Sequence, residues 1–235
     1  MQDTRWSMVW RAGHAATGQM RTALQSLCQE YWPAVYAYIR RWGKSSHDAE
    51  DLTQAFFCHL FDSGWFSKAH PGRGRLRGFL YQSLESFLLM DHRALQSKKR
   101  SGNANHLQLE HAERIYTAQM SDGDTPDRVF TRQWVMTLIQ YALDAMSARY
   151  ARRGQSDVFA ALLPFLSESA AVPPDQESPE AVAAALSMKP ATFRVTLSRA
   201  RESFREFLYV EVGKTMATSD PTELRRELEF LLGYL

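Results

Sequence analysis

Positively charged side chains gather in two segments of the chain. Residues 68–100 carry eight Lys and Arg against two acids, a net charge of +6. Residues 189–205 carry five Lys and Arg against one acid, a net charge of +4. Guanidinium and ammonium groups bind the phosphates of nucleic acids, so two clusters predict contact with nucleic acid at two places. Two solvated surfaces would give the same charge pattern, and the net charge of the whole chain is only +2.

The first cluster has a composition that suits unpaired nucleic acid. GRGRLRGFLY (72–81) joins a turn rich in Gly and Arg to aromatic residues, and QSKKR (96–100) adds further bases. Nucleobases can stack on aromatic rings while Arg and Lys hold the phosphates. The turn lacks the Gly-Lys-Ser/Thr ending of a phosphate-binding loop. Phe79, Leu80 and Leu84 are equally suited to a hydrophobic core.

The second cluster lies in a helix–turn–helix pattern. An Ala-rich segment ends at Leu186, and Ser187–Lys189 forms a tight turn. Pro190 suits the first turn of the next helix, where its missing N–H costs nothing. That helix would be polar on one face and apolar on the other, which is typical of a helix that reads the major groove. Many helical hairpins share this pattern, and Gly is more usual than Ser in the turn.

A third segment, SHDAEDLTQAFFCHL (46–60), combines acids with helical apolar spacing. Ser46 can cap the predicted helix, and acids in its first turns suit the positive end of the helix dipole. We expect one face to carry the acids and Gln54, and the other to be apolar. A capped surface helix would account for the acids without a special role for Gln54. The acids are Asp48, Glu50 and Asp51.

No arrangement of side chains predicts catalysis. The seven His are scattered without metal-ligand spacing, and Cys28 and Cys58 lack the close pairing of a zinc site. No Gly-x-Ser-x-Gly nucleophile elbow occurs. We therefore expect a protein that is not an enzyme and has neither metal nor cofactor. Without a signal peptide or a run of about 18 apolar residues, we also expect a cytoplasmic protein with reduced thiols and no membrane contact.

The elements that must position these residues are helices. Apolar residues recur every three or four positions over most of the chain, and the alternation typical of strands is absent. This periodicity predicts an all-α protein of two small helical domains. The clearest helices are predicted over 20–42, 46–60, 79–89, 129–150 and 157–165.

Changes in composition predict the domain boundaries. We expect a first domain over 1–100, a polar linker over 101–128, a second domain over 129–210 and a C-terminal extension over 211–235. The end of the chain, 206–235, has a net charge of −3 and contains an amphipathic helical pattern. We expect that helix to pack on the C-terminal domain, either as a simple cap or as a regulatory element.

Together these segments resemble an extracytoplasmic-function (ECF) sigma factor of the sigma-70 family. Such proteins give bacterial RNA polymerase its promoter specificity, and they have two helical domains, region 2 and region 4. DAEDLTQAFF (48–57) resembles the region 2.2 helix that binds the β′ clamp helices of the polymerase core. FLYQSLESFLLMDHR (79–93) resembles the region that melts and reads the −10 element. The helix–turn–helix at 180–205 resembles region 4.2, which reads the −35 element and docks on the β flap. Resemblance covers nearly the whole chain and extends to TELRRELEFLLGYL (222–235).

The resemblance implies three groups of site residues. The core polymerase would be bound by Asp48, Glu50, Asp51, Leu52, Gln54 and Phe57. The −10 element would be bound by Tyr81, Gln82, Ser86, Arg93, Lys98, Lys99 and Arg100. The −35 element would be bound by Thr192, Arg194, Val195, Thr196, Ser198, Arg199 and Arg201. Ser86 stands where the family more often has an Asn that helps capture a flipped base, and Val195 is suited to a thymine methyl group.

The implied partners are the polymerase core and promoter DNA. An anti-sigma factor or a Ser/Thr protein kinase is the expected kind of regulator, and Thr53, beside the acids, is a candidate phosphorylation site. Two other functions fit the same residues. One is a stand-alone helix–turn–helix transcriptional regulator that binds duplex DNA by itself, and the other is a regulatory adaptor that keeps the fold without binding DNA.

Overall fold

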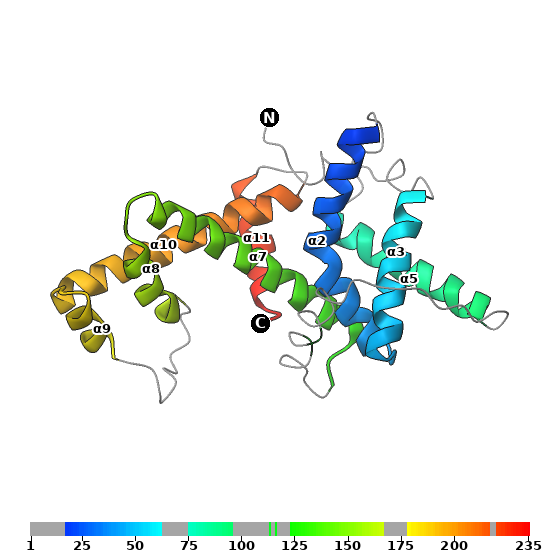
Figure 1. Ribbon diagram of the computed structural model, residues 1–235, viewed down its shortest axis with the longest axis horizontal. Helices are drawn as coiled ribbons and strands as arrows, with labels where there is room; N and C mark the ends of the chain where they lie inside the picture. Colours follow the sequence, from blue (N-terminus) through cyan, green and yellow to red (C-terminus); the bar gives the residue numbers. More distant parts are fainter. Residues whose placement is uncertain are drawn as a thin grey trace. The chain divides into compact units, whose positions relative to one another are not determined.

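The computed structural model describes residues 17–62, 75–95, 113, 116, 123–166, 178–216 and 220–235. Regular structure in these ranges is helical throughout, with no strand (Figure 1). The prediction of an all-α fold is confirmed for this part of the chain. The described residues form two compact units. The first comprises those up to Thr137 together with Val212–Leu235, and the second is Leu138–Glu211.

The first unit is built around an aromatic core. Tyr31 and Trp134 are fully buried, and their rings stack with centroids 6.0 Å apart. Trp32 and Phe57 stack at 5.8 Å, where the first two helices pack side by side. Aromatic rings of this size remove a large apolar area from water when they are buried. Its helices are α2 (Thr17–Arg41), α3 (Ser46–Asp62), α5 (Leu76–Leu95), the start of α7 (Pro126–Ala151) and α11 (Pro221–Leu232).

The second unit has a separate apolar core. Phe193 is fully buried and meets the edge of Phe165 at a centroid distance of 5.9 Å. Met146 and Leu162 complete the centre of this cluster. The helices are the rest of α7, α8 (Ser156–Leu162), the 3-10 turn η2 (Leu163–Phe165), α9 (Pro179–Ala185) and most of α10 (Pro190–Thr215).

The N-terminus of α3 is capped by Ser45, not by Ser46 as the sequence suggested. The Ser45 hydroxyl oxygen accepts a bond from the Asp48 amide at 3.1 Å and donates to the Asp48 carboxylate at 2.7 Å. Ser46 is already the first helical residue, so its side chain cannot reach an unpaired amide of the first turn. The acid at Asp48 therefore completes the cap, beyond its favourable place near the helix dipole.

Two described residues of the expected linker attach to α2. Glu113 accepts bonds from Arg40 Nε at 3.0 Å and Nη2 at 2.8 Å, and also from the Tyr36 hydroxyl. Tyr116 is buried, and its ring centroid lies 5.1 Å from the Arg40 guanidinium carbon. Burial disfavours the Glu113 carboxylate, but the bonds from Arg40 and Tyr36 outweigh it and lower the pKa of Glu113. These residues therefore belong to the first unit.

The C-terminal helix α11 packs in the first unit, which corrects our expectation that it packs on the C-terminal domain. Leu228 and Leu231 are buried there. The carboxylate of Glu227, 1% exposed, lies 2.6 Å from Nη1 of Arg75, the residue before α5, and 3.5 Å from Nη2 of Arg77 within α5. The physical reason is charge: an acid on an apolar helix face needs a buried partner, and these arginines provide it.

Further contacts hold the end of the chain in the same unit. The carbonyl oxygen of Tyr234 accepts a bond from Arg132 Nε at 3.0 Å. Arg132 also binds Asp124 with both terminal nitrogens, at 2.6 and 3.2 Å. The Tyr234 ring centroid lies 5.7 Å from the Arg128 guanidinium carbon. The start of α7 therefore shares the binding of the C-terminal segment with α5.

Replacing Glu227 by Ala should destabilise the first unit by about 3 kcal/mol, because Arg77 would remain buried without its carboxylate partner. Urea denaturation followed by circular dichroism measures this. Glu229→Ala is the matched control, since Glu229 is exposed on the same helix and its loss should cost less than about 0.5 kcal/mol. Equal losses in the two variants would contradict a structural role for the ion pair.

Candidate functional site

A helix, a short turn and a second helix occur where the sequence predicted them in the second unit. Ser178 caps α9 by accepting a bond from the Ala181 amide at 3.2 Å. The helix ends at Ala185, and Ser187, two residues later, has a φ of +54°. The amide of Met188 donates to the Ala183 carbonyl at 2.8 Å, and that of Ser187 to the Ala184 carbonyl at 3.0 Å. This is the Schellman arrangement, in which glycine is usual at the left-handed position.

Helix α10 has the two faces that the sequence predicted. Phe193, Leu197 and Ala200 are buried in the core of the second unit. Thr196 is half-buried, and its hydroxyl donates to the carbonyl of Thr192 at 2.8 Å. The opposite face is free for a ligand of the second unit. The predicted residues that it exposes are Thr192, Arg194, Val195, Ser198 and Arg199.

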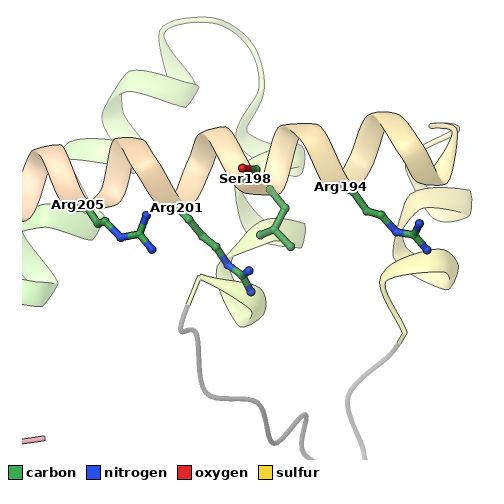
Figure 2. Close-up of a pocket in the computed structure, with 5 residues that line it drawn as sticks. Arg194, Ser198, Arg201 and Arg205 are labelled. Carbon is green, nitrogen blue, oxygen red and sulfur yellow. The ribbon is translucent and has the colours of Figure 1, made fainter.

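A basic groove runs along α10. It has a volume of about 380 Å³ and is lined by Arg194, Leu197, Ser198, Arg201 and Arg205. Figure 2 shows the side chains of Arg194, Arg201 and Arg205 projecting from the same side of the helix. Sequence reasoning missed Arg205, although its spacing of four and eleven residues from the other two arginines places it on their helical face. Such a row suits the phosphates of a nucleic-acid backbone.

Two arginines of this groove already have partners within the second unit. Arg194 Nη2 lies 2.8 Å from Glu180 Oε1 of α9, and both side chains are largely exposed (68% and 52%). The bond from Arg194 lowers the pKa of Glu180. Arg201 is half-buried and donates from Nε to the Phe165 carbonyl at 3.0 Å. Arg201 therefore ties α10 to η2, whereas Arg194 can exchange its partner at the surface.

Replacing Ser187 by Gly should raise the free energy of unfolding by about 0.5 kcal/mol. A left-handed conformation costs an L-residue about 1–2 kcal/mol, and the greater freedom of Gly in the unfolded chain offsets part of the gain. Ala184→Gly, at an exposed helical position of α9, should instead lower stability by about 1 kcal/mol. Urea denaturation of both variants checks the opposite signs. A loss of stability in both would argue against strain at Ser187.

On α3, the structure exposes part of the predicted polymerase-binding group. Asp48 and Gln54 are exposed, and Asp51 and Leu52 are half-buried. Glu50 and Phe57 are each only 2% exposed, so they do not share that surface. Their spacing of seven residues puts both on the inward face of the helix, and this pattern was present in the sequence. The surface that α3 offers to a partner is therefore smaller and more polar than expected.

Thr53 lies on the same inward face of α3. Its side chain is 0% exposed, and its hydroxyl donates to the Ala49 carbonyl at 2.6 Å. A kinase needs an accessible hydroxyl, and a phosphate here would bring about two negative charges into the core. The geometry therefore argues against Thr53 as a phosphorylation site.

On α5, Gln82 and Ser86 are exposed and four residues apart, which places them on one face of the helix. Tyr81 is half-buried; its hydroxyl donates to Glu85 at 3.0 Å, and its ring meets the edge of Phe130 at 6.0 Å. Arg93 belongs to α5, but its side chain and the predicted residues Lys98, Lys99 and Arg100 lie outside the described residues.

The same helix exposes two apolar side chains that sequence reasoning missed. Leu89 and Met90 are 53% and 46% exposed. They follow Ser86 by three and four residues, so they continue its face of α5. An apolar surface beside small and polar side chains suits contact with an unpaired nucleobase better than contact with a duplex backbone.

The described ranges contain neither a metal-binding cluster nor a membrane-spanning helix. No group of three or more His, Cys, Asp and Glu side chains in these ranges could hold a metal ion. None of the helices described is both long enough and apolar enough to cross a membrane.

A known protein family matches the first unit. Residues 27–98 match the family model of sigma-70 region 2, and the matched range includes α3, α5 and the second half of α2. No curated protein and no solved structure shows a significant match to the chain. The family match supports a relation to sigma-70 factors, and it ends before the helix–turn–helix of the second unit.

Proposed function

We propose that this chain is a sigma factor of the ECF type that binds the RNA polymerase core and directs it to promoters. The observation that carries the proposal is the match of residues 27–98 to sigma-70 region 2. An independent observation supports it: a helix–turn–helix with an exposed basic groove lies outside the matched range. The chain would act in the cytoplasm, with an anti-sigma factor or a protein kinase as its regulator.

The proposed contact with the polymerase core is the exposed part of α3. Asp48, Asp51 and Gln54 present carboxylates and an amide, which accept hydrogen bonds from basic and polar side chains. The β′ clamp helices are the partner that the resemblance to region 2.2 implies. Because Glu50 and Phe57 are buried, their part is to shape α3 from within.

The proposed contact with the −10 element is the face of α5 that contains Gln82, Ser86 and Leu89. An unpaired base could enter between these side chains, with the small Ser86 leaving room for it. Unpairing costs a few kcal/mol, which base capture and phosphate contacts must offset. Arg93, Lys98, Lys99 and Arg100 are the residues proposed to hold the phosphates nearby.

The proposed contact with the −35 element is the first half of α10. Arg194 and Arg199 can each bind a guanine edge with two hydrogen bonds, and Val195 can contact a thymine methyl group. Thr192, Thr196 and Ser198 would add polar contacts, and Arg201 and Arg205 would face phosphates along the groove. Arg194 must first leave Glu180, which costs little because both side chains are exposed.

This mechanism requires no bond-making by the chain, which is not an enzyme under the proposal. The polymerase core carries out RNA synthesis, and the sigma factor supplies sequence recognition. A second candidate function is a stand-alone helix–turn–helix regulator, which the exposed arginines of α10 also favour. That regulator would bind duplex DNA without the polymerase. A non-DNA-binding adaptor would keep the contact of α3 and lose that of α10.

Replacing Asp51 by Arg should weaken binding to purified RNA polymerase core at least about tenfold, because a buried like charge at an interface costs more than 1 kcal/mol. Surface plasmon resonance with immobilised core measures this. Glu223→Arg is the control, since it makes the same charge reversal at an exposed position of α11. If neither the native chain nor the variants bind the core, the stand-alone regulator becomes the better proposal.

Run-off transcription on genomic DNA, with core polymerase and the purified chain, tests promoter recognition and reports the promoter sequence. Arg194→Ala should reduce specific transcripts by roughly 5- to 150-fold, the value of one bidentate contact with guanine, while binding to the core is retained. Glu180→Gln should keep or increase transcription, because it releases Arg194. Arg152→Ala is the control, as an exposed arginine of the second unit outside α10. Full activity of Arg194→Ala would remove Arg194 from the −35 contact.

A further inference from the structure

Two arginines at the start of α5 have no part in the proposed promoter contacts. Arg75 and Arg77 belong to the most basic segment of the chain, residues 68–100, yet both are paired with one acid of the C-terminal helix. Each oxygen of that carboxylate meets a different arginine. Oε2 of Glu227 lies 2.6 Å from Arg75, and Oε1 lies 3.5 Å from Arg77.

We propose that Arg75 and Arg77 form a latent phosphate-binding site for single-stranded DNA, which Glu227 of α11 occupies in the free protein. The two non-bridging oxygens of a phosphodiester present the same pair of acceptors as the two oxygens of a carboxylate. Guanidinium groups bind both with charge-assisted hydrogen bonds. The inference rests on the proposed function, because promoter DNA unpaired at the −10 element would be the ligand.

One arginine of the pair is held in place by its neighbours, and the other is accessible at the surface. Arg77 is held by a bond to the Thr131 hydroxyl at 3.1 Å, and its guanidinium carbon lies 5.4 Å from the Trp134 ring centroid. Arg75 is 46% exposed, so it can meet a ligand at the surface. The Phe230 ring centroid lies 6.0 Å from the Arg75 guanidinium carbon, and this ring is itself exposed. A cation held in place next to an accessible cation favours a ligand with two anionic oxygens.

Glu227 is enclosed, so the site opens only if α11 moves away from α5. Its side chain is 1% exposed, and no phosphate can reach both arginines while it is in place. Burial raises the pKa of Glu227, and the two arginines oppose this shift only in part. A phosphodiester offers two charged oxygens to the same two cations, so it can take the place of the carboxylate. The acidic end of the chain therefore acts as an internal competitor for DNA.

Fluorescence anisotropy of a labelled single-stranded oligonucleotide tests this with the full-length chain and without polymerase. The Kd is measured over a series of salt concentrations for the native chain, for Glu227→Gln and for Glu229→Gln. Both variants lose one negative charge from α11, but Glu229 is exposed and is not paired with Arg75 or Arg77. In the native chain, DNA must displace Glu227 to reach the two arginines, so Glu227→Gln should lower the Kd at least about fivefold more than Glu229→Gln does. Equal Kd values for the two variants would overturn the proposal.

Hydrogen exchange in the native chain gives an independent test that does not depend on how well a variant folds. Saturating oligonucleotide should increase amide exchange across Pro221–Leu232, because α11 must leave the arginines. Unchanged protection of α11 while DNA is bound would overturn the proposal, even if Glu227→Gln proved unstable by circular dichroism. If the proposed function is wrong, a different result is expected: the chain would not bind the polymerase core, whereas both DNA readouts here would be unaffected.

Discussion

The buried carboxylate of Glu227 is the interaction on which the first unit depends most. It joins α11 to Arg77 of α5 and to Arg75 just before that helix, and Arg77 in turn reaches α7 through Thr131 and the Trp134 ring. Removal of its charge would leave Arg77, which is 13% exposed, without its carboxylate partner, and that penalty exceeds what an exposed ion pair contributes. The end of the chain is therefore part of the same folded body as the helices matched to sigma-70 region 2.

Internal pairing also gives the near-neutral net charge a physical meaning. Within the described ranges, Arg40 binds Glu113, Arg132 binds Asp124, Arg194 binds Glu180, and Glu227 takes two further arginines. Several of the cations that made the chain look like a nucleic-acid binder are thus already occupied by its own acids. Binding to a polyanion must then exchange one partner for another, so its free energy is smaller than the count of arginines implies.

Local periodicity predicted the helices, but it could not predict contacts between residues far apart in the sequence. Apolar spacing was enough to locate α2, α3 and α7 to within three residues, because a helix face repeats every three to four positions. The same spacing places Glu50 and Phe57 on one face of α3, so the burial of Glu50 could have been predicted from the sequence. Nothing local connects Glu227 with α5. Its partners lie far away in the sequence, and the amphipathic pattern of α11 indicates only that one face is buried, without saying against what.

Exposure separates the two arginine sites by how readily they can exchange partners. The pair between Arg194 and Glu180 is open to water, which already screens it, so DNA can replace the carboxylate without moving a helix. Arg77 is only 13% exposed, and its carboxylate can be replaced only when α11 leaves its apolar contacts. Under the proposed function, duplex recognition through α10 would therefore come at low cost, before unpaired DNA reaches α5. The larger cost then falls on the later step, in which the melted strand must displace α11 from Arg75 and Arg77.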